Sequence, residues 1–137
     1  MLRLKTPEHL RIVQADGFEA SYGGAESNVA VSLANLGDDA AFLTKLPKNP
    51  VGDAAFNELR RYGVDTSRIL RGGARLGIYF FEKGSDIRPT SVLYDRAGSA
   101  LAEADADEFN WEALLSGIDI FFFSGVTPAI SPSVEHT

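Results

Sequence analysis

Two helical patterns, each closed by a glycine, alternate with short apolar runs in the first half of the chain. Three apolar side chains share one helical face within residues 29–36, and Gly37 follows them, where a left-handed C-terminal residue is favoured. The second pattern covers residues 55–62 and is closed by Gly63. Residues 40–46, between the helices, have the short apolar character of a buried parallel strand. This alternation predicts a layered α/β fold.

The second half of the chain continues the alternation. A third helix is expected to begin near Asp107 and to end at Gly117. Residues 118–123 contain three consecutive phenylalanines and are expected to form a strand that is buried on both faces. A fourth helix is expected to begin at Ser131, a capping residue followed by Pro132. Because natural domains seldom end just after a helix has begun, we expect the chain to be a fragment.

Two further β-type runs, residues 76–82 and 91–96, have no helical pattern between them. They are therefore expected to pair as antiparallel neighbours. Residues 12–22 could add a third extended segment. A small antiparallel sheet of this kind, formed by strands at about 12–22 and 75–98 and inserted into an α/β core, is typical of a lid.

Composition limits the classes of function. The chain has 137 residues, 45% of them hydrophobic and 23% charged, as in one soluble globular domain. Its net charge of −6 argues against binding to nucleic acid or to an anionic membrane. The chain contains no cysteine and two histidines, which argues against disulfides and a histidine-built zinc site. No signal peptide is recognised, so a cytoplasmic location is expected.

A glycine pair directly before the first helix is one candidate binding element. Gly23 and Gly24 would let a ligand approach the backbone, and the following helix start offers unpaired N–H groups. Asn28 adds an amide that can donate to and accept from a sugar hydroxyl. The alternative is an ordinary tight turn that leads into a helix. The sequence contains neither a dinucleotide fingerprint nor a P-loop.

A second candidate lies on the run 91–96. Side chains alternate along a strand, so Tyr94 and Arg96 share one face. They offer a ring for sugar carbons and a guanidinium fork for a carboxylate, and Tyr79 on the preceding strand could join them. The alternative is an exposed sheet face with ordinary cross-strand pairs. Arg75 and Arg88 flank these strands and are expected to be solvated.

Several of these segments together resemble one enzyme family. The glycine turn and first helix are similar to the N-terminal signature of the ribokinase-like carbohydrate kinases. Among its members, the chain most resembles the 2-keto-3-deoxygluconate kinases, and the resemblance covers nearly all of it. The residues that carry it are Gly23, Gly24, Ala25, Glu26, Asn28, Leu36, Gly37, Asn49, Gly52, Gly77, Tyr79, Arg88, Tyr94, Asp95, Arg96, Ser99, Ser124, Gly125 and Thr127.

The resemblance implies a three-layer α/β/α core with a β-sheet lid over the sugar, and phosphoryl transfer from ATP with Mg²⁺. Carried over by position, it implies that the glycine turn contacts sugar hydroxyls and that the lid strands contact a sugar acid. Val126 is a weaker candidate in a loop that lines the pocket. The substrate-binding residues implied are Gly23, Gly24, Asn28, Tyr79, Tyr94 and Arg96.

Two departures from the family pattern limit these expectations. A strand that usually opens the family would precede Met1, and the catalytic aspartate and ATP site would follow Thr137. The chain is therefore expected to hold most of the sugar site but no catalytic residue. We expect the full-length protein to be a homo-oligomer that phosphorylates 2-keto-3-deoxygluconate. The alternatives are a fructokinase-like enzyme acting on a neutral sugar and a non-catalytic binding or assembly module.

Overall fold

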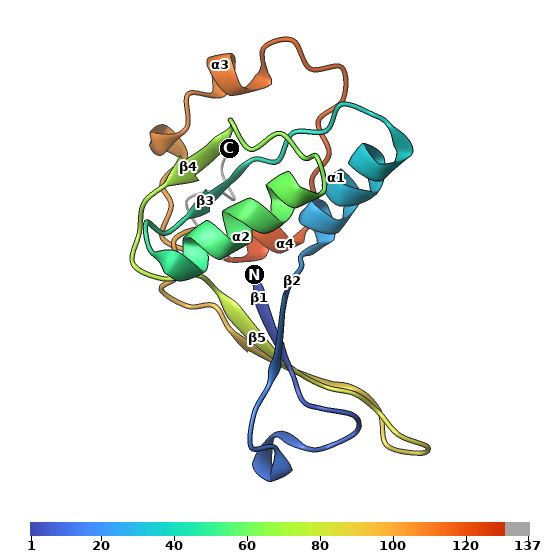
Figure 1. The fold of residues 1–137 in the computed structure, drawn as a ribbon. Helices are drawn as coiled ribbons and strands as arrows, with labels where there is room; N and C mark the ends of the chain where they lie inside the picture. The colour runs from blue at the N-terminus through green and yellow to red at the C-terminus, as the bar shows by residue number, and fades with distance from the viewer. Residues whose placement is uncertain (131–137) are drawn as a thin grey trace.

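A computed structural model describes residues 1–130 of the chain. A four-stranded sheet with the order β2-β1-β5-β6 extends away from a helical body (Figure 1). Its strands are β1 (Leu2–Lys5), β2 (Glu19–Tyr22), β5 (Ile78–Glu82) and β6 (Ser91–Asp95). β1 pairs in parallel with β5, and the two outer pairs are antiparallel.

The antiparallel pairing of β5 with β6 confirms the expectation from the two β-type runs. The prediction that residues 12–22 are extended was only partly right. The segment ends in the strand β2, but its first residues form a 3₁₀ turn, η1 (Ile12–Gln14). The Ile12 N–H donates to Glu82 Oε1 at 2.6 Å, which draws this segment towards β5 and out of strand geometry. β1 was not predicted at all, although Leu2 and Leu4 alternate with polar residues.

The helical body contains α1 (Ala25–Leu36) and a strand–helix–strand unit. In that unit, β3 (Thr44–Leu46) and β4 (Ile69–Arg71) pair in parallel and are connected through α2 (Pro50–Arg61). α1 and α2 lie next to this two-stranded sheet in Figure 1. The predicted α/β alternation is confirmed here, but β3 is shorter than residues 40–46.

Both predicted helix ends are observed. Gly37 has φ 96° and Gly63 has φ 80°, the left-handed region that glycine adopts without a steric cost. The Gly37 N–H donates to the Ala34 carbonyl, and the next amide reaches back to Leu33, so the last helical carbonyls of α1 are satisfied.

Apolar side chains from both helices meet the strands in one core. Its buried members come from α1, α2, the turn after α2, β3, β4 and the segment before β5, and they are Ala30, Leu46, Ala55, Leu59, Val64, Ile69 and Leu76. Half-buried side chains, among them Phe42 and Phe56, pack around them. This core fixes the start of α1 relative to β3, and so positions the site described below.

The third predicted helix is divided in two. Residues Ala106–Glu108 form a 3₁₀ turn, η2, and Trp111–Leu115 form a short helix, α3. Each piece has its own cap: Asp105 accepts from the Asp107 N–H, and Asn110 accepts from the Ala113 N–H. Two successive caps interrupt the helical hydrogen bonding, which a single apolar pattern could not reveal.

The predicted buried strand at residues 118–123 was wrong. These residues form no strand, and Phe121, Phe122 and Phe123 are 51%, 52% and 64% exposed. A two-sided strand needs neighbours for its backbone groups and a layer over each face, and residues 1–130 supply neither. A short helix, α4 (Val126–Ile130), follows. The helix expected from Ser131 lies outside the described residues, and no helix within them could span a bilayer.

The turn between α2 and β4 should make stability depend on pH. Asp65 accepts hydrogen bonds from the Ser67 N–H at 2.8 Å and the Ser67 hydroxyl at 2.9 Å. These bonds, assisted by Arg68, hold the pKa of the Asp65 carboxyl below its usual value. The stabilisation is therefore complete above about pH 4 and is lost as pH falls through the lowered pKa.

We expect Asp65→Asn to weaken this pH dependence, because the amide keeps an acceptor but does not titrate there. Asp65 is exposed, so the difference should stay below about 1 kcal/mol. Urea unfolding of both proteins at pH 6 and pH 3 measures it. If the wild type and Asp65→Asn lost the same stability on acidification, Asp65 would not be the source of the pH dependence.

Candidate substrate-binding site

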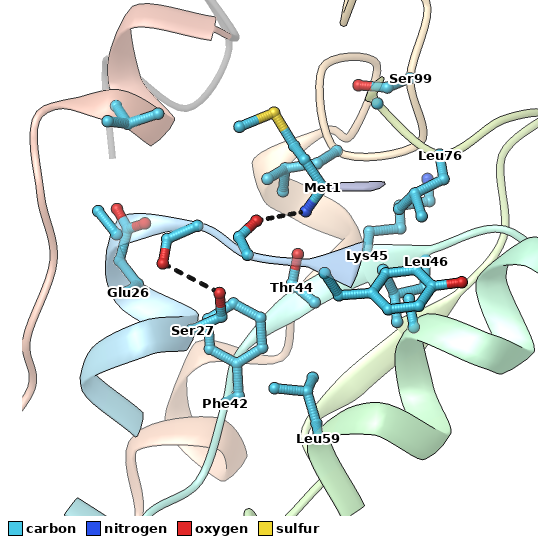
Figure 2. Close-up of a pocket in the computed structure, with 18 of the residues that line it drawn as sticks. Met1, Glu26, Ser27, Phe42, Thr44, Lys45, Leu46, Leu59, Leu76 and Ser99 are labelled. Carbon is cyan, nitrogen blue, oxygen red and sulfur yellow. Dashed lines mark hydrogen bonds between the residues drawn. The ribbon is translucent and has the colours of Figure 1, made fainter. Parts of the chain in front are cut away.

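A pocket of about 400 Å³ lies where the four-stranded sheet joins the helical body. The start of α1 forms one wall, and residues around 75–77 and 96–101 form another. Its apolar lining includes Phe42, Leu46, Leu59 and Leu76, which Figure 2 labels together with Thr44 and Lys45 from β3. An apolar surface with a few polar groups at its edges suits a small polar molecule with a carbon skeleton.

The glycine turn places the first turn of α1 at the pocket wall. The Gly23 N–H donates to the Met1 carbonyl at 3.1 Å, which ties the turn to β1. The Ser27 hydroxyl donates to the Gly24 carbonyl at 3.1 Å (Figure 2). The Asn28 N–H donates to the same carbonyl at 2.9 Å. No hydrogen bond within residues 1–130 uses the Asn28 side chain, so it can face a ligand from an ordered helix start.

Gly23 also brings a lid residue close to the helix. A β-carbon at Gly23 would lie 3.3 Å from the Tyr79 hydroxyl oxygen and 3.7 Å from Asn28 Oδ1. The absence of a side chain therefore lets Tyr79, from β5, approach the beginning of α1. This contact joins the two candidate elements of the sequence, the glycine turn and the strand pair.

Four side chains form a row across one face of the sheet. The strand registers place Ser21 opposite Arg3, Arg3 beside Tyr79, and Tyr79 opposite Tyr94. The Arg3 Nε donates to Ser21 Oγ at 2.8 Å, and the two tyrosine rings have centroids 5.8 Å apart. The row presents hydroxyls, aromatic faces and a guanidinium on a single surface.

Arg96 continues this surface just beyond β6. Its guanidinium carbon lies 4.8 Å from the centre of the Tyr94 ring, and the residue lines the pocket. Gly77 allows the close approach, since a β-carbon there would lie 3.3 Å from Arg96 Cβ. Arg96 has no carboxylate partner among residues 1–130, so its N–H donors are available to a ligand.

Arg75, which was expected to be solvated, instead holds the turn that carries Arg96. Its Nη1 donates to Asp95 Oδ1 at 2.9 Å, and its Nη2 donates to the Asp95 carbonyl at 3.0 Å. A third bond, of 3.3 Å, reaches the Ala97 carbonyl. The Arg75 side chain also holds the pKa of Asp95 below its usual value. Arg75 therefore orders the backbone on both sides of Arg96.

Charged side chains of both signs line the pocket, the carboxylates being Glu26 and Glu58. Lys45 is neutralised by Glu108, 2.5 Å away, and this bond holds the pKa of Glu108 below its usual range. Arg3 and Arg96 also line the pocket and have no ion-pair partner in the described part of the chain. Burial, and to a lesser degree Glu58, raises the pKa of Tyr22, so that phenol stays neutral. The unpaired guanidinium groups of Arg3 and Arg96 can therefore bind an anion locally, although the whole chain is acidic.

The structure brings the six predicted site residues together, but only four of them line the pocket. Gly23, Gly24, Asn28 and Arg96 line the pocket itself. The two tyrosines lie beside it on the sheet face, where Tyr79 contacts Gly23 and Tyr94 contacts Arg96. Val126, the weaker candidate, also lines the pocket.

Three further candidates were missed from the sequence: Arg3, Ser21 and Glu26. Arg3 and Ser21 were missed because β1 and the short span of β2 were not recognised. The alternation of leucine with basic residues over Leu2–Lys5 was the available signal. Glu26 has a long-range partner, Ser124, which no local pattern indicates.

Comparisons with known proteins agree on one family. A curated relative, 2-dehydro-3-deoxygalactonokinase from Haloferax volcanii, is 42% identical over the whole chain, which covers 43% of that protein. The crystal structure of 2-dehydro-3-deoxygluconokinase from Thermotoga maritima superimposes with a TM-score of 0.93 and 56% identity. That match covers 96% of this chain and 40% of the Thermotoga chain. The sequence therefore spans about two fifths of the length of these relatives.

A sugar kinase from Pyrococcus horikoshii, solved in complex with ATP, is more distant, with 28% identity and a TM-score of 0.86. It matches 98% of this chain, which covers 44% of that structure. The high TM-scores confirm the predicted fold class. The pfkB family carbohydrate kinase profile matches residues 2–136. The predicted resemblance is thus confirmed, and the chain belongs to the pfkB family of carbohydrate kinases.

Proposed function

We propose that this chain is the N-terminal part of an ATP-dependent kinase that phosphorylates a sugar acid, 2-keto-3-deoxygluconate. The observation that carries the proposal is Arg96, which lines the pocket, stacks on Tyr94 and lacks a carboxylate partner within residues 1–130. A guanidinium can bind a carboxylate through two parallel hydrogen bonds. A neutral sugar would leave this group without its natural partner.

The names of the relatives support a sugar acid. The Haloferax and Thermotoga proteins are kinases of 2-dehydro-3-deoxy sugar acids, and 2-dehydro-3-deoxygluconate is another name for 2-keto-3-deoxygluconate. A 33% identical relative from Clostridium beijerinckii is a 5-dehydro-2-deoxygluconokinase. These names agree in a keto-deoxy sugar skeleton, which also fits the apolar part of the pocket.

Each proposed site residue has a role in binding. The Asn28 amide and the Gly24 backbone would contact sugar hydroxyls at the start of α1, while Gly23 admits the Tyr79 hydroxyl. Tyr94 would hold Arg96 over the pocket, where Arg96 binds the carboxylate. Fixing the sugar in this way would orient its reactive hydroxyl for phosphoryl transfer.

The described residues do not fit the binding of Mg²⁺. Residues 1–130 contain no group of three or more side chains that could hold a metal ion. The pocket carboxylate of Glu26 already accepts hydrogen bonds from Ser124. We therefore assign Mg²⁺, and with it the ATP that the Pyrococcus relative binds, to parts of the protein outside these residues. The catalytic base is assigned there too, and no residue of this chain is proposed as catalytic.

The proposal includes the setting in which the enzyme works. Its partner is a small sugar acid, not nucleic acid or membrane, and the protein is a cytoplasmic homo-oligomer. The outer strand β6 supports self-association, because its outer edge pairs with no other strand of residues 1–130 and it exposes Val92, Leu93 and Tyr94. Such edges favour pairing between chains.

Phosphorylation assays of the whole protein test the function. We expect ATP-dependent product formation with 2-keto-3-deoxygluconate at an efficiency at least about ten-fold above that with fructose or ribose. The galactonate epimer of this substrate should also be assayed, because the Haloferax relative is named as a galactonate kinase and the Thermotoga relative as a gluconate kinase. A preference for fructose would overturn the assignment of a sugar acid, and the absence of phosphorylation with all sugars would overturn the kinase assignment.

A further inference from the structure

Glu26 connects two segments of the pocket wall that lie far apart in the sequence. It belongs to the first turn of α1, and its partner Ser124 lies 98 residues later, just before α4. Glu26 Oε1 accepts from the Ser124 hydroxyl at 2.5 Å and from the Ser124 N–H at 3.2 Å. Both side chains are half-buried, where hydrogen bonds to a carboxylate compete less with water.

A third bond extends this connection into α4. The Val126 N–H donates to Ser124 Oγ at 3.2 Å, so the Ser124 hydroxyl accepts from Val126 while it donates to Glu26. The hydrogen bonds thus run in one direction, from Val126 through Ser124 to Glu26. They fix both the backbone and the side chain of the turn that leads into α4.

Both ends of this chain of bonds lie at the pocket. Glu26 and Asn28 line it from α1, and Val126 and Thr127 line it from the start of α4. The segment 118–123 before Ser124 forms no strand, so regular secondary structure does not hold the turn from that side. The three hydrogen bonds therefore set the position of this part of the wall.

An acidic residue in the first turn of a helix has an ordinary role, which is to stabilise the helix dipole. That role requires no distant partner. Glu112, in the first turn of α3, is exposed and has no side-chain partner in the described part of the chain. Glu26 differs because its carboxylate accepts two hydrogen bonds from one distant residue. Glu112 therefore provides a matched control.

We propose that Glu26 is a positioning residue that sets the width of the sugar site by holding the Ser124–Val126 turn against the start of α1. The inference rests on the proposed function in so far as the pocket is the sugar site. Glu26 does not need to contact the substrate. Its effect on binding passes through Ser124 to the wall residues Val126 and Thr127.

Kinetics of the whole protein provide the first test. Glu26→Ala removes the acceptor for both Ser124 bonds, and we expect KM for the sugar to rise about five- to fifty-fold while kcat changes less than about three-fold. Glu26→Gln keeps an Oε1 acceptor and should stay within about three-fold of the wild-type KM. Glu112→Ala should leave both constants unchanged. A wild-type KM in Glu26→Ala, or an equal rise in Glu26→Gln and Glu26→Ala, would overturn the proposal.

Amide hydrogen exchange provides a second test that requires no activity. We expect exchange at Ser124 and Val126 to become at least about ten-fold faster in Glu26→Ala, to stay near the wild-type rate in Glu26→Gln, and to be unaffected by Glu112→Ala. Unchanged exchange in Glu26→Ala would refute the positioning role even if the kinase assignment holds. Conversely, exchange could be faster in Glu26→Ala while the wild-type protein phosphorylates no sugar. That result would support the positioning role and reject only the proposed function.

A second variant covers the case in which Glu26→Ala does not fold. Ser124→Ala leaves the Ser124 N–H bond to Glu26 but removes both bonds of the hydroxyl. It should raise KM by a smaller factor, about two- to ten-fold, and speed exchange at Val126. No effect on either quantity would contradict the proposal.

Discussion

Replacing Gly52 by alanine should destabilise the protein by about 1–3 kcal/mol, although alanine is the better helix former. Gly52 is buried in the first turn of α2, and its N–H donates to Asn49 Oδ1 at 2.9 Å. A β-carbon there would lie 2.1 Å from the Pro47 carbonyl oxygen. Because that oxygen is backbone, and Arg71 donates a hydrogen bond to it, it cannot move aside without moving the whole turn.

The expected displacement reaches the core, since α2 contributes Ala55 and Leu59 to it. Thermal unfolding of the whole protein should show a midpoint lowered by several degrees. Gly17→Ala is the matched control, because apart from its chain neighbours no atom of residues 1–130 lies within 4 Å of a β-carbon at Gly17, and its φ is not in the left-handed region. Equal midpoints for Gly52→Ala and Gly17→Ala would show that α2 tolerates the added methyl group.

Much of this local structure could be predicted because its causes are local. Gly37 and Gly63 end helices by adopting a left-handed conformation that other residues disfavour. The pairing of β5 with β6 follows from two adjacent β-type runs with no helical segment between them. In these cases, the residues that determine the structure lie within a few positions of the structure itself.

The failures have non-local or competing causes. β1 is only four residues long and becomes a strand by pairing with β2 on one side and β5, more than seventy residues away, on the other. Residues 118–123 have strong strand propensity, but a strand also requires neighbours, which residues 1–130 do not provide. The third helix was divided by Asp105 and Asn110, whose side chains cap separate turns.

The candidate site was partly predictable for a similar reason. The alternation of side chains along a strand places Tyr94 and Arg96 on one face, and the structure brings them into contact. The contact between Gly23 and Tyr79 requires the fold, because it joins the start of α1 to β5. Arg3 depends on the unpredicted β1. The roles of all these residues in binding remain predictions that mutation can test.

The assignment of a sugar acid depends most on Arg96. Five ion pairs link arginines or lysines to carboxylates in residues 1–130, and none includes Arg96. Its neighbour Arg75, in contrast, is paired with Asp95. Arg96 is therefore held in place by Tyr94 and by the turn that Arg75 orders, while its own donors remain available. This arrangement suits a group that binds an anion from outside the chain.

Replacing Arg96 by alanine should lower kcat/KM with 2-keto-3-deoxygluconate by about ten- to a hundred-fold, the value of a charge-assisted contact of roughly 1.5–3 kcal/mol. Arg96→Lys should recover only part of this loss, because an ammonium group cannot form the two parallel bonds of a guanidinium. Arg60→Ala is the control, since that residue is exposed, does not line the pocket and lies over the ring of Phe56, which does not line it either. The efficiency with a neutral sugar such as fructose should change much less than that with the acid.

Equal losses for both substrates would mean that Arg96 shapes the sheet surface and does not bind the carboxylate. No loss with either substrate would remove it from the site, and with it the main structural reason for proposing a sugar acid.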